Sequence, residues 1–154
     1  MFFPYFRGRQ YELLALKELV QKGLISKYVI PVVEPIKISP TLKNTIQAFD
    51  KAGLNFSDSD ISSLLELMSD SIIPAVIFNE SAEETLDVIE TRKGLTKDKV
   101  LSVLKSPDYV ENFQHAYMND NPKYVLLSDE RSMRRAVKEN RVLFEDKFNK
   151  QPKN

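Results

Sequence analysis

The feature that most constrains this chain is a set of short β-branched runs that are apolar at odd and even positions alike. Residues 28–33, 72–78 and 124–127 are such runs. A strand with one solvated face alternates apolar and polar residues, whereas a strand covered on both faces is apolar throughout. The three runs therefore predict strands of a parallel sheet that carries helices.

Segments with helical periodicity separate these strands. The predicted helices cover residues 11–22, 41–52, about 60–68, 82–91, 97–105 and 108–118, and a long charged helix begins near Arg131. Ser39 and Pro40 suit the cap and the first position of the second helix. Strands that alternate with helices favour right-handed crossovers between parallel strands. The predicted fold class is therefore α/β, with a mainly parallel sheet and crossover helices.

The spacing of the strands is unusual for such a fold, because each gap holds more than one helix. Residues 54–56 and 94–95 fall where a further, very short strand is expected. Pro31 and Pro74 donate no ladder hydrogen bond, which indicates a strand start, an edge or a bulge. Three strands make a small sheet. We therefore expect one domain over residues 1–154 with a frayed tail at 148–154, a partial or incomplete TIM-barrel-like unit and the N-terminal part of a longer protein.

Composition excludes several classes of protein. The chain has 154 residues, of which 42% are hydrophobic and 29% charged, and it has no cysteine. No apolar stretch approaches the roughly 20 residues that span a bilayer. These features predict a cytoplasmic protein that does not contact membranes. There is no Walker loop, no dinucleotide-binding glycine pattern and no serine-nucleophile elbow, so no cofactor is predicted except a divalent cation.

The charges sum to zero but are unevenly spread. Residues 52–91 hold nine acids and no Lys or Arg, and residues 131–154 hold eight bases against three acids. Zero net charge argues against a dedicated nucleic-acid binder. The two blocks are typical of solvated faces that complement each other within the chain or across subunits.

Acidic residues follow each of the three predicted strands. They are Glu34, Glu80, Asp129 and Glu130, with Asn79 beside the second. The carboxyl ends of parallel strands share one edge of the sheet. Carboxylates gathered there would bind a divalent cation or act as general acid and base. The alternative is that they cap helices, which explains Glu34 least well because it lies between apolar segments.

Basic residues give two further candidates. Arg7 and Arg9 flank Gly8, where they would clamp a phosphate or form an ion pair with Glu34 or Asp129. A second group lies on the predicted C-terminal helix and would follow a nucleic-acid backbone or face the acidic block; it comprises Arg131, Arg134, Arg135, Lys138 and Arg141. The single histidine, His115, has no second histidine or cysteine nearby in sequence, which argues against zinc.

Three segments carry a resemblance to a known family. They are residues 5–16, residues 30–35, and a late block made of Arg134, 140–143, 145–148 and Gln151. Together they resemble the phage-type "beta protein" family of bacteria and phages. The resemblance implies a TIM-barrel-like protein nearly twice this length, of which this chain is the N-terminal half. Because members occur in mobile-element or phage-defence settings, it also implies a protein partner.

These observations leave three hypotheses for function. The first is a non-catalytic interaction or assembly module that binds a protein partner or a second copy. The second is a metal-assisted phosphoester enzyme in which the four carboxylates hold a metal and Arg7 or Arg9 holds the phosphate. The third is nucleic-acid contact through the basic helix.

Overall fold

The computed structural model describes residues 1–35, 37–67, 69, 71–127 and 141–143. Within this part the strands are β1 (Tyr5–Phe6), β2 (Val32–Val33), β3 (Phe56–Asp58), β4 (Ile72–Ile77), β5 (Leu101–Leu104), β6 (Tyr124–Leu127) and β7 (Arg141–Leu143). The helices are α1 (Gln10–Gln21), α2 (Pro40–Ala52), α3 (Ile61–Glu66), α4 (Ala82–Lys93) and α5 (Val110–Ala116), and the short 3-10 turns are η1 (Lys97–Lys99) and η2 (Pro107–Tyr109).

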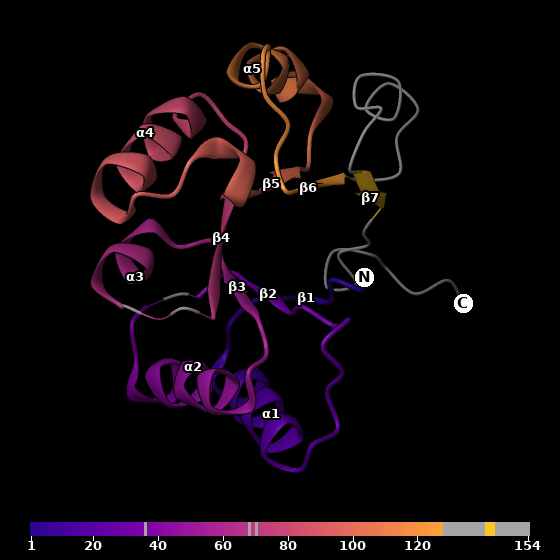
Figure 1. The fold of residues 1–154 in the computed structure, drawn as a ribbon, viewed down its shortest axis with the longest axis vertical. Helices are drawn as coiled ribbons and strands as arrows, with labels where there is room; N and C mark the ends of the chain where they lie inside the picture. The colour runs from indigo at the N-terminus through magenta and orange to yellow at the C-terminus, as the bar shows by residue number, and fades with distance from the viewer. Residues whose placement is uncertain (36, 68, 70, 128–140, 144–154) are drawn as a thin grey trace.

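The described strands form one parallel sheet whose spatial order is the order of the chain, from β1 to β7. The sheet curls into a half-barrel, and the helices follow one another along its outer side (Figure 1). Each crossover thus joins neighbouring strands, as in a singly wound barrel. The predicted fold class, an α/β partial barrel, is confirmed.

Two apolar layers lie on opposite faces of the sheet. Consecutive residues of a strand point to opposite faces, so Val32 belongs to the inner cluster and Val33 to the outer one. The inner cluster also spans the concave face from β1 to β6, because the rings of Phe3 and Tyr124 lie 5.1 Å apart. Strands that are apolar on both parities are therefore explained by burial on both faces.

Several predicted elements need correction. Residues 97–105 are the turn η1 and the strand β5 rather than a helix. The apolar positions 100, 101, 103 and 104 fit both periods, so their pattern alone did not separate helix from strand. The charged helix predicted from Arg131 does not extend through residues 141–143, which form β7. The short strand expected at residues 54–56 lies slightly later, as β3, whereas Gly94 caps α4 and the strand expected at residues 94–95 is β5 at residues 101–104. β1 is not predicted by the sequence pattern.

The two strand prolines occupy positions where a missing donor is tolerated. Pro31 precedes β2, as predicted for a strand start. Pro74 lies inside β4, which pairs with β3 over residues 72–74 and with β5 over residues 75–77. Pro74 is therefore at the point where β4 changes its neighbour.

Asp58 is a charged residue inside the sheet. It is fully buried at the end of β3, where Oδ1 accepts from the Asp60 amide at 2.9 Å and Oδ2 from the Ser63 hydroxyl at 2.7 Å. These bonds hold the loop that starts α3. Burial nevertheless raises the pKa of the carboxyl from 3.8 to about 6, and the two hydrogen bonds only partly offset this.

This raised pKa predicts a specific pH dependence. Folded Asp58 holds its proton more tightly than the unfolded chain does. The stability that this proton binding contributes is therefore complete below pH 3.8 and is lost as pH rises through about 6. A difference of about 2 units corresponds to about 3 kcal/mol. As pH rises from 4 to 7, the free energy of unfolding of Asp58→Asn should increase by roughly this amount relative to that of the wild type. Urea unfolding of both proteins across this range measures it, and a pH-independent difference would contradict the assignment.

Candidate functional site

A polar cluster lies at the carboxyl ends of the strands, built from three strands that are not all neighbours. Lys105, directly after β5, places its Nζ 2.6 Å from Oε1 of Glu34, directly after β2. The hydroxyl of Tyr5, in β1, donates to the same Glu34 oxygen. Lys105 Nζ also lies 4.6 Å from the centre of the Tyr5 ring. We call these three residues the rim triad.

The curl of the sheet brings the triad together. Glu34 and Lys105 are 71 residues apart in sequence, and β2 and β5 are separated by two strands. Beneath them lies the apolar inner cluster, to which Tyr5 belongs. The side chains of Glu34 and Lys105 keep 27% and 29% of their surface exposed, while Tyr5 keeps 7%. The triad thus consists of a half-buried ion pair and a buried tyrosine at the mouth of the half-barrel.

Gly8 holds the loop after β1 against the loop after β2. Its φ is +74°, and a Cβ there would lie 2.6 Å from Pro35 Cα and 2.8 Å from the Glu34 carbonyl oxygen. Only glycine permits both this backbone conformation and this approach. Gly8 therefore fixes Arg7 and Arg9 next to the start of the β2–α2 loop. Arg9 Nη1 donates to the Tyr11 hydroxyl at 3.1 Å, which raises the pKa of the guanidinium.

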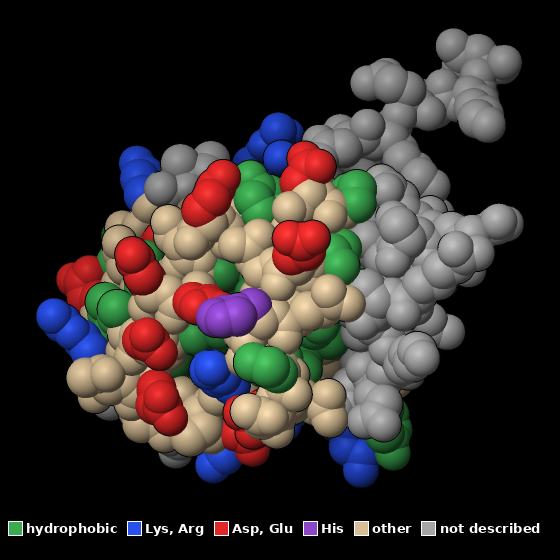
Figure 2. All heavy atoms as spheres, turned by 90° about the horizontal axis from the view of Figure 1, so that it is seen from above, with side chains coloured by type: hydrophobic (Ala, Val, Ile, Leu, Met, Phe, Trp, Pro, Cys, Tyr) green, Lys and Arg blue, Asp and Glu red, His purple; other side chains and the backbone are tan. Residues whose placement is uncertain are grey.

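The second group of predicted site residues has other partners. Asn79 Oδ1 accepts from the Ser81 amide at 2.8 Å, which shapes the turn before α4. Glu80 accepts from the Tyr109 hydroxyl at 3.3 Å, and its charge raises the pKa of that phenol. Both residues line a hollow of about 300 Å³ with Glu111 and with the paired Glu83 and His115. Figure 2 shows acidic side chains gathered around the histidine.

The structure therefore gives Glu34 and Glu80 separate surroundings. Within the described residues, no three His, Cys, Asp or Glu side chains are grouped so as to hold a metal ion. Asp129 and Glu130 lie outside these residues, and the four-carboxylate site stays a prediction. Arg131, Arg134, Arg135 and Lys138 also lie outside them, whereas the backbone of Arg141 belongs to β7 and not to the predicted helix.

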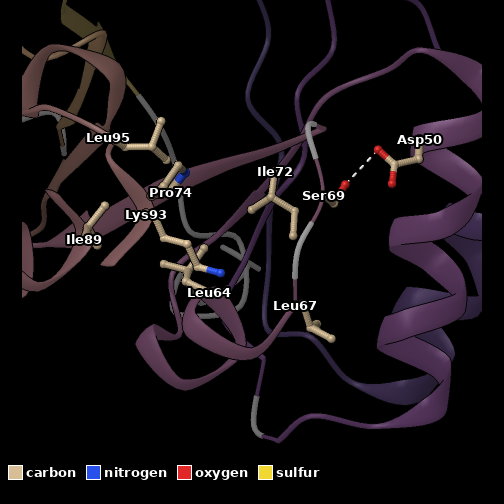
Figure 3. Close-up of a pocket in the computed structure, with 9 residues that line it drawn as sticks. All are labelled: Asp50, Leu64, Leu67, Ser69, Ile72, Pro74, Ile89, Lys93 and Leu95. Carbon is tan, nitrogen blue, oxygen red and sulfur yellow. Dashed lines mark hydrogen bonds between the residues drawn. The ribbon is translucent and has the colours of Figure 1, made fainter. Parts of the chain in front are cut away.

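The amino ends of the strands carry a different kind of hollow, with a volume of about 660 Å³. Apolar side chains from α3, β4 and α4 line it, with Lys93 at one wall (Figure 3). On the opposite wall the Ser69 hydroxyl donates to Asp50 at 2.7 Å. Because α3 has only six residues, it leaves this space between α2 and α4. The hollow lies at the amino-terminal face of the half-barrel. In α/β barrels this face contributes to stability, and catalytic residues lie at the opposite face.

Sequence reasoning found Glu34 but missed its partners. It offered Arg7 or Arg9 as the neutralising cation, and the structure places Lys105 there. The pattern of residues 97–105 predicts a helix, which places Lys105 away from the strand ends. The signal was nevertheless present, since residues 100–104 are apolar on both parities except for Ser102, as in the strands that were recognised.

Comparisons with known proteins add no relative. No family description, no curated protein and no solved structure matches the chain. The resemblance to the "beta protein" family therefore stays a prediction. No helix in the described residues is long and apolar enough to cross a membrane.

The rim triad gives a prediction for stability. In a double-mutant cycle, Glu34→Gln and Lys105→Met should show a coupling free energy of about 1 kcal/mol, because the pair is half-buried and shares the Tyr5 hydroxyl. The coupling should shrink in 1 M NaCl, where charges are screened. Urea unfolding of the four proteins measures it. A coupling of zero at low salt would contradict an ordered pair.

The loop packing gives a second prediction with a matched control. Gly8→Ala should destabilise the protein by about 2–4 kcal/mol, because the methyl group meets backbone atoms and the positive φ is strained. Gly53 has a φ of +67° but open space around its Cβ position. Gly53→Ala should therefore cost only the conformational part, about 1 kcal/mol. Thermal unfolding compares the two, and equal losses would contradict the close approach at Gly8.

Proposed function

We propose that this domain is an assembly module that associates with a second copy of itself through its first βα unit. The observation that carries the proposal is the distribution of exposed apolar side chains. Of eight large apolar residues exposed in the described part, seven belong to residues 1–28. They are Met1, Phe2, Tyr11, Leu14, Leu19, Leu24 and Tyr28, and we call them the edge patch.

The edge patch lies in the βα unit at the first edge of the half-barrel. β1 is the first strand in the sheet order, and α2 is the helix that packs on α1 in the part of the chain described. In a closed barrel every βα unit is covered on both sides. Exposed apolar side chains that gather in one edge unit are typical of an interface.

Backbone contacts order much of the patch. The Phe2 amide donates to the Tyr28 carbonyl at 2.7 Å, and the Leu24 amide donates to the Leu19 carbonyl at 2.9 Å. Tyr11 and Leu14 are three residues apart on α1 and share one face of the helix. The exposed side chains are thus attached to ordered backbone, which lowers the entropy lost on association.

A second copy is the simplest occupant for such a surface. A two-fold interface uses the same patch on both subunits, so an apolar patch is complementary to itself. The zero net charge of the chain adds no long-range repulsion between copies. Two subunits that meet through β1 and α1 would each cover the other's exposed edge unit.

The test is the oligomeric state at increasing protein concentration. Sedimentation equilibrium of the wild type should show a reversible dimer that does not weaken between 50 mM and 500 mM NaCl, since apolar contact is not screened by salt. Leu14→Glu with Leu24→Glu should weaken the dimer by at least about tenfold, because each buried apolar side chain contributes 1.5 kcal/mol or more. Circular dichroism confirms that the variants fold.

Met118→Glu is the matched control. Met118 is 70% exposed and is the one large apolar residue of the eight outside residues 1–28, so its substitution should leave the dimer unchanged. A wild type that stays monomeric up to millimolar concentration would overturn the proposal. A dimer that dissociates steeply with salt would assign the association to the opposed charge blocks instead.

A further inference from the structure

A cavity of about 520 Å³ lies between the loop after β1 and the loop after β2. Its volume falls within the range of sites that hold small molecules. One wall comes from residues 8–10 and 13, and the other from residues 37–41. The cavity is therefore at the carboxyl ends of the strands, where parallel α/β folds place ligands.

The charge of the cavity lining has one sign. Arg9 on one loop and Lys37 on the other both line it, and none of its lining residues is acidic. Glu12, the acid in the first turn of α1, is buried and is not part of the lining, but its charge acts on the Arg9 guanidinium. Glu34 forms an ion pair with Lys105. The remaining polar groups of the lining include the hydroxyls of Ser39 and Thr41.

Backbone amides add to the same potential. α1 begins at Gln10, and its cap residue Arg9 makes no side-chain hydrogen bond to the first turn. α2 begins at Pro40, which has no amide hydrogen, and has no acid in its first turn; its Leu42 amide donates to the Ser39 hydroxyl, which leaves the Thr41 amide to face a ligand. The positive ends of two helices of 12 and 13 residues thus open beside the two cations.

Gly8 allows the two loops to approach each other. A Cβ there would lie 2.6 Å from Pro35 Cα and 2.8 Å from the Glu34 carbonyl oxygen, so the loop that carries Arg9 packs against the start of the loop after β2. This close approach therefore requires glycine.

We propose that this cavity binds the phosphate group of a phosphorylated small molecule. Arg9 and Lys37 hold the phosphate oxygens from opposite walls, as charge-assisted donors do in phosphate sites. The cavity is several times larger than a phosphate ion, so the remainder takes a neutral polar body such as a sugar. The cavity lining includes none of the edge patch, but the two adjoin, because Arg9 Nη1 donates to the hydroxyl of Tyr11 in that patch.

The test titrates the full chain with ribose 5-phosphate, inorganic phosphate, sulfate and ribose in a non-phosphate buffer. Nitrogen–proton correlation spectra should show shifts at the Gly8, Gln10 and Thr41 amides. Ribose 5-phosphate should bind more tightly than inorganic phosphate, and ribose should not bind. Tighter binding of inorganic phosphate would limit the site to the free ion and overturn the small-molecule assignment.

Arg9→Gln with Lys37→Gln should weaken binding of ribose 5-phosphate by at least tenfold. Lys43→Gln is the control, because Lys43 is an exposed cation on α2 that does not line the cavity. Its affinity should equal that of the wild type. The proposal is overturned if no shift appears at 10 mM ligand, if sulfate binds as tightly as phosphate, or if the control loses as much affinity as the double variant.

Discussion

The inner apolar cluster is the interaction on which the rest of this structure depends. Burial of side chains such as Val32, Leu101 and Leu126 on the concave face stabilises a curled sheet, because a flat sheet would leave that face exposed to water. At the amino ends the curl brings Phe3, before β1, into contact with Tyr124 of β6. At the carboxyl ends the same curvature brings Glu34 to Lys105. The polar cluster at the rim therefore depends on burial of the inner apolar cluster.

Charge is placed in this fold according to how well it can be compensated. Asp58 lies within the buried layer, where two hydrogen bonds do not fully offset its desolvation and its pKa rises to about 6. Glu34 lies at the rim, where it receives a cation and a phenol. The first arrangement orders a loop at some cost to stability, and the second leaves an organised polar surface that water and ligands can reach.

The first βα unit carries both proposed surfaces, which adjoin at the hydrogen bond between Arg9 and Tyr11. Its amino-terminal segment, its helix and the loop before β2 bear the edge patch, while the loop after β1 faces the cationic cavity. This division is natural in a parallel α/β sheet, because loops at the carboxyl ends of strands vary freely while strands and helices must pack. An edge unit has in addition one side that no neighbouring unit of the sheet order covers.

The sequence by itself determined the fold class, because burial on both faces of a strand leaves a pattern that any reader of the chain can see at residues 28–33, 72–78 and 124–127. It also determined α2 with its Ser39 cap, and the place of Glu34 directly after β2. It did not separate β5 from a helix, since the apolar positions of residues 100–104 satisfy both periods, and two-residue β1 is too short to leave a pattern. The tertiary structure decided the pairing of Glu34 with Lys105 and Tyr5, and it placed Arg9 and Lys37 in the lining of one cavity. These residues are 28 or more positions apart, and only the curl of the sheet and the approach at Gly8 bring them to the same site.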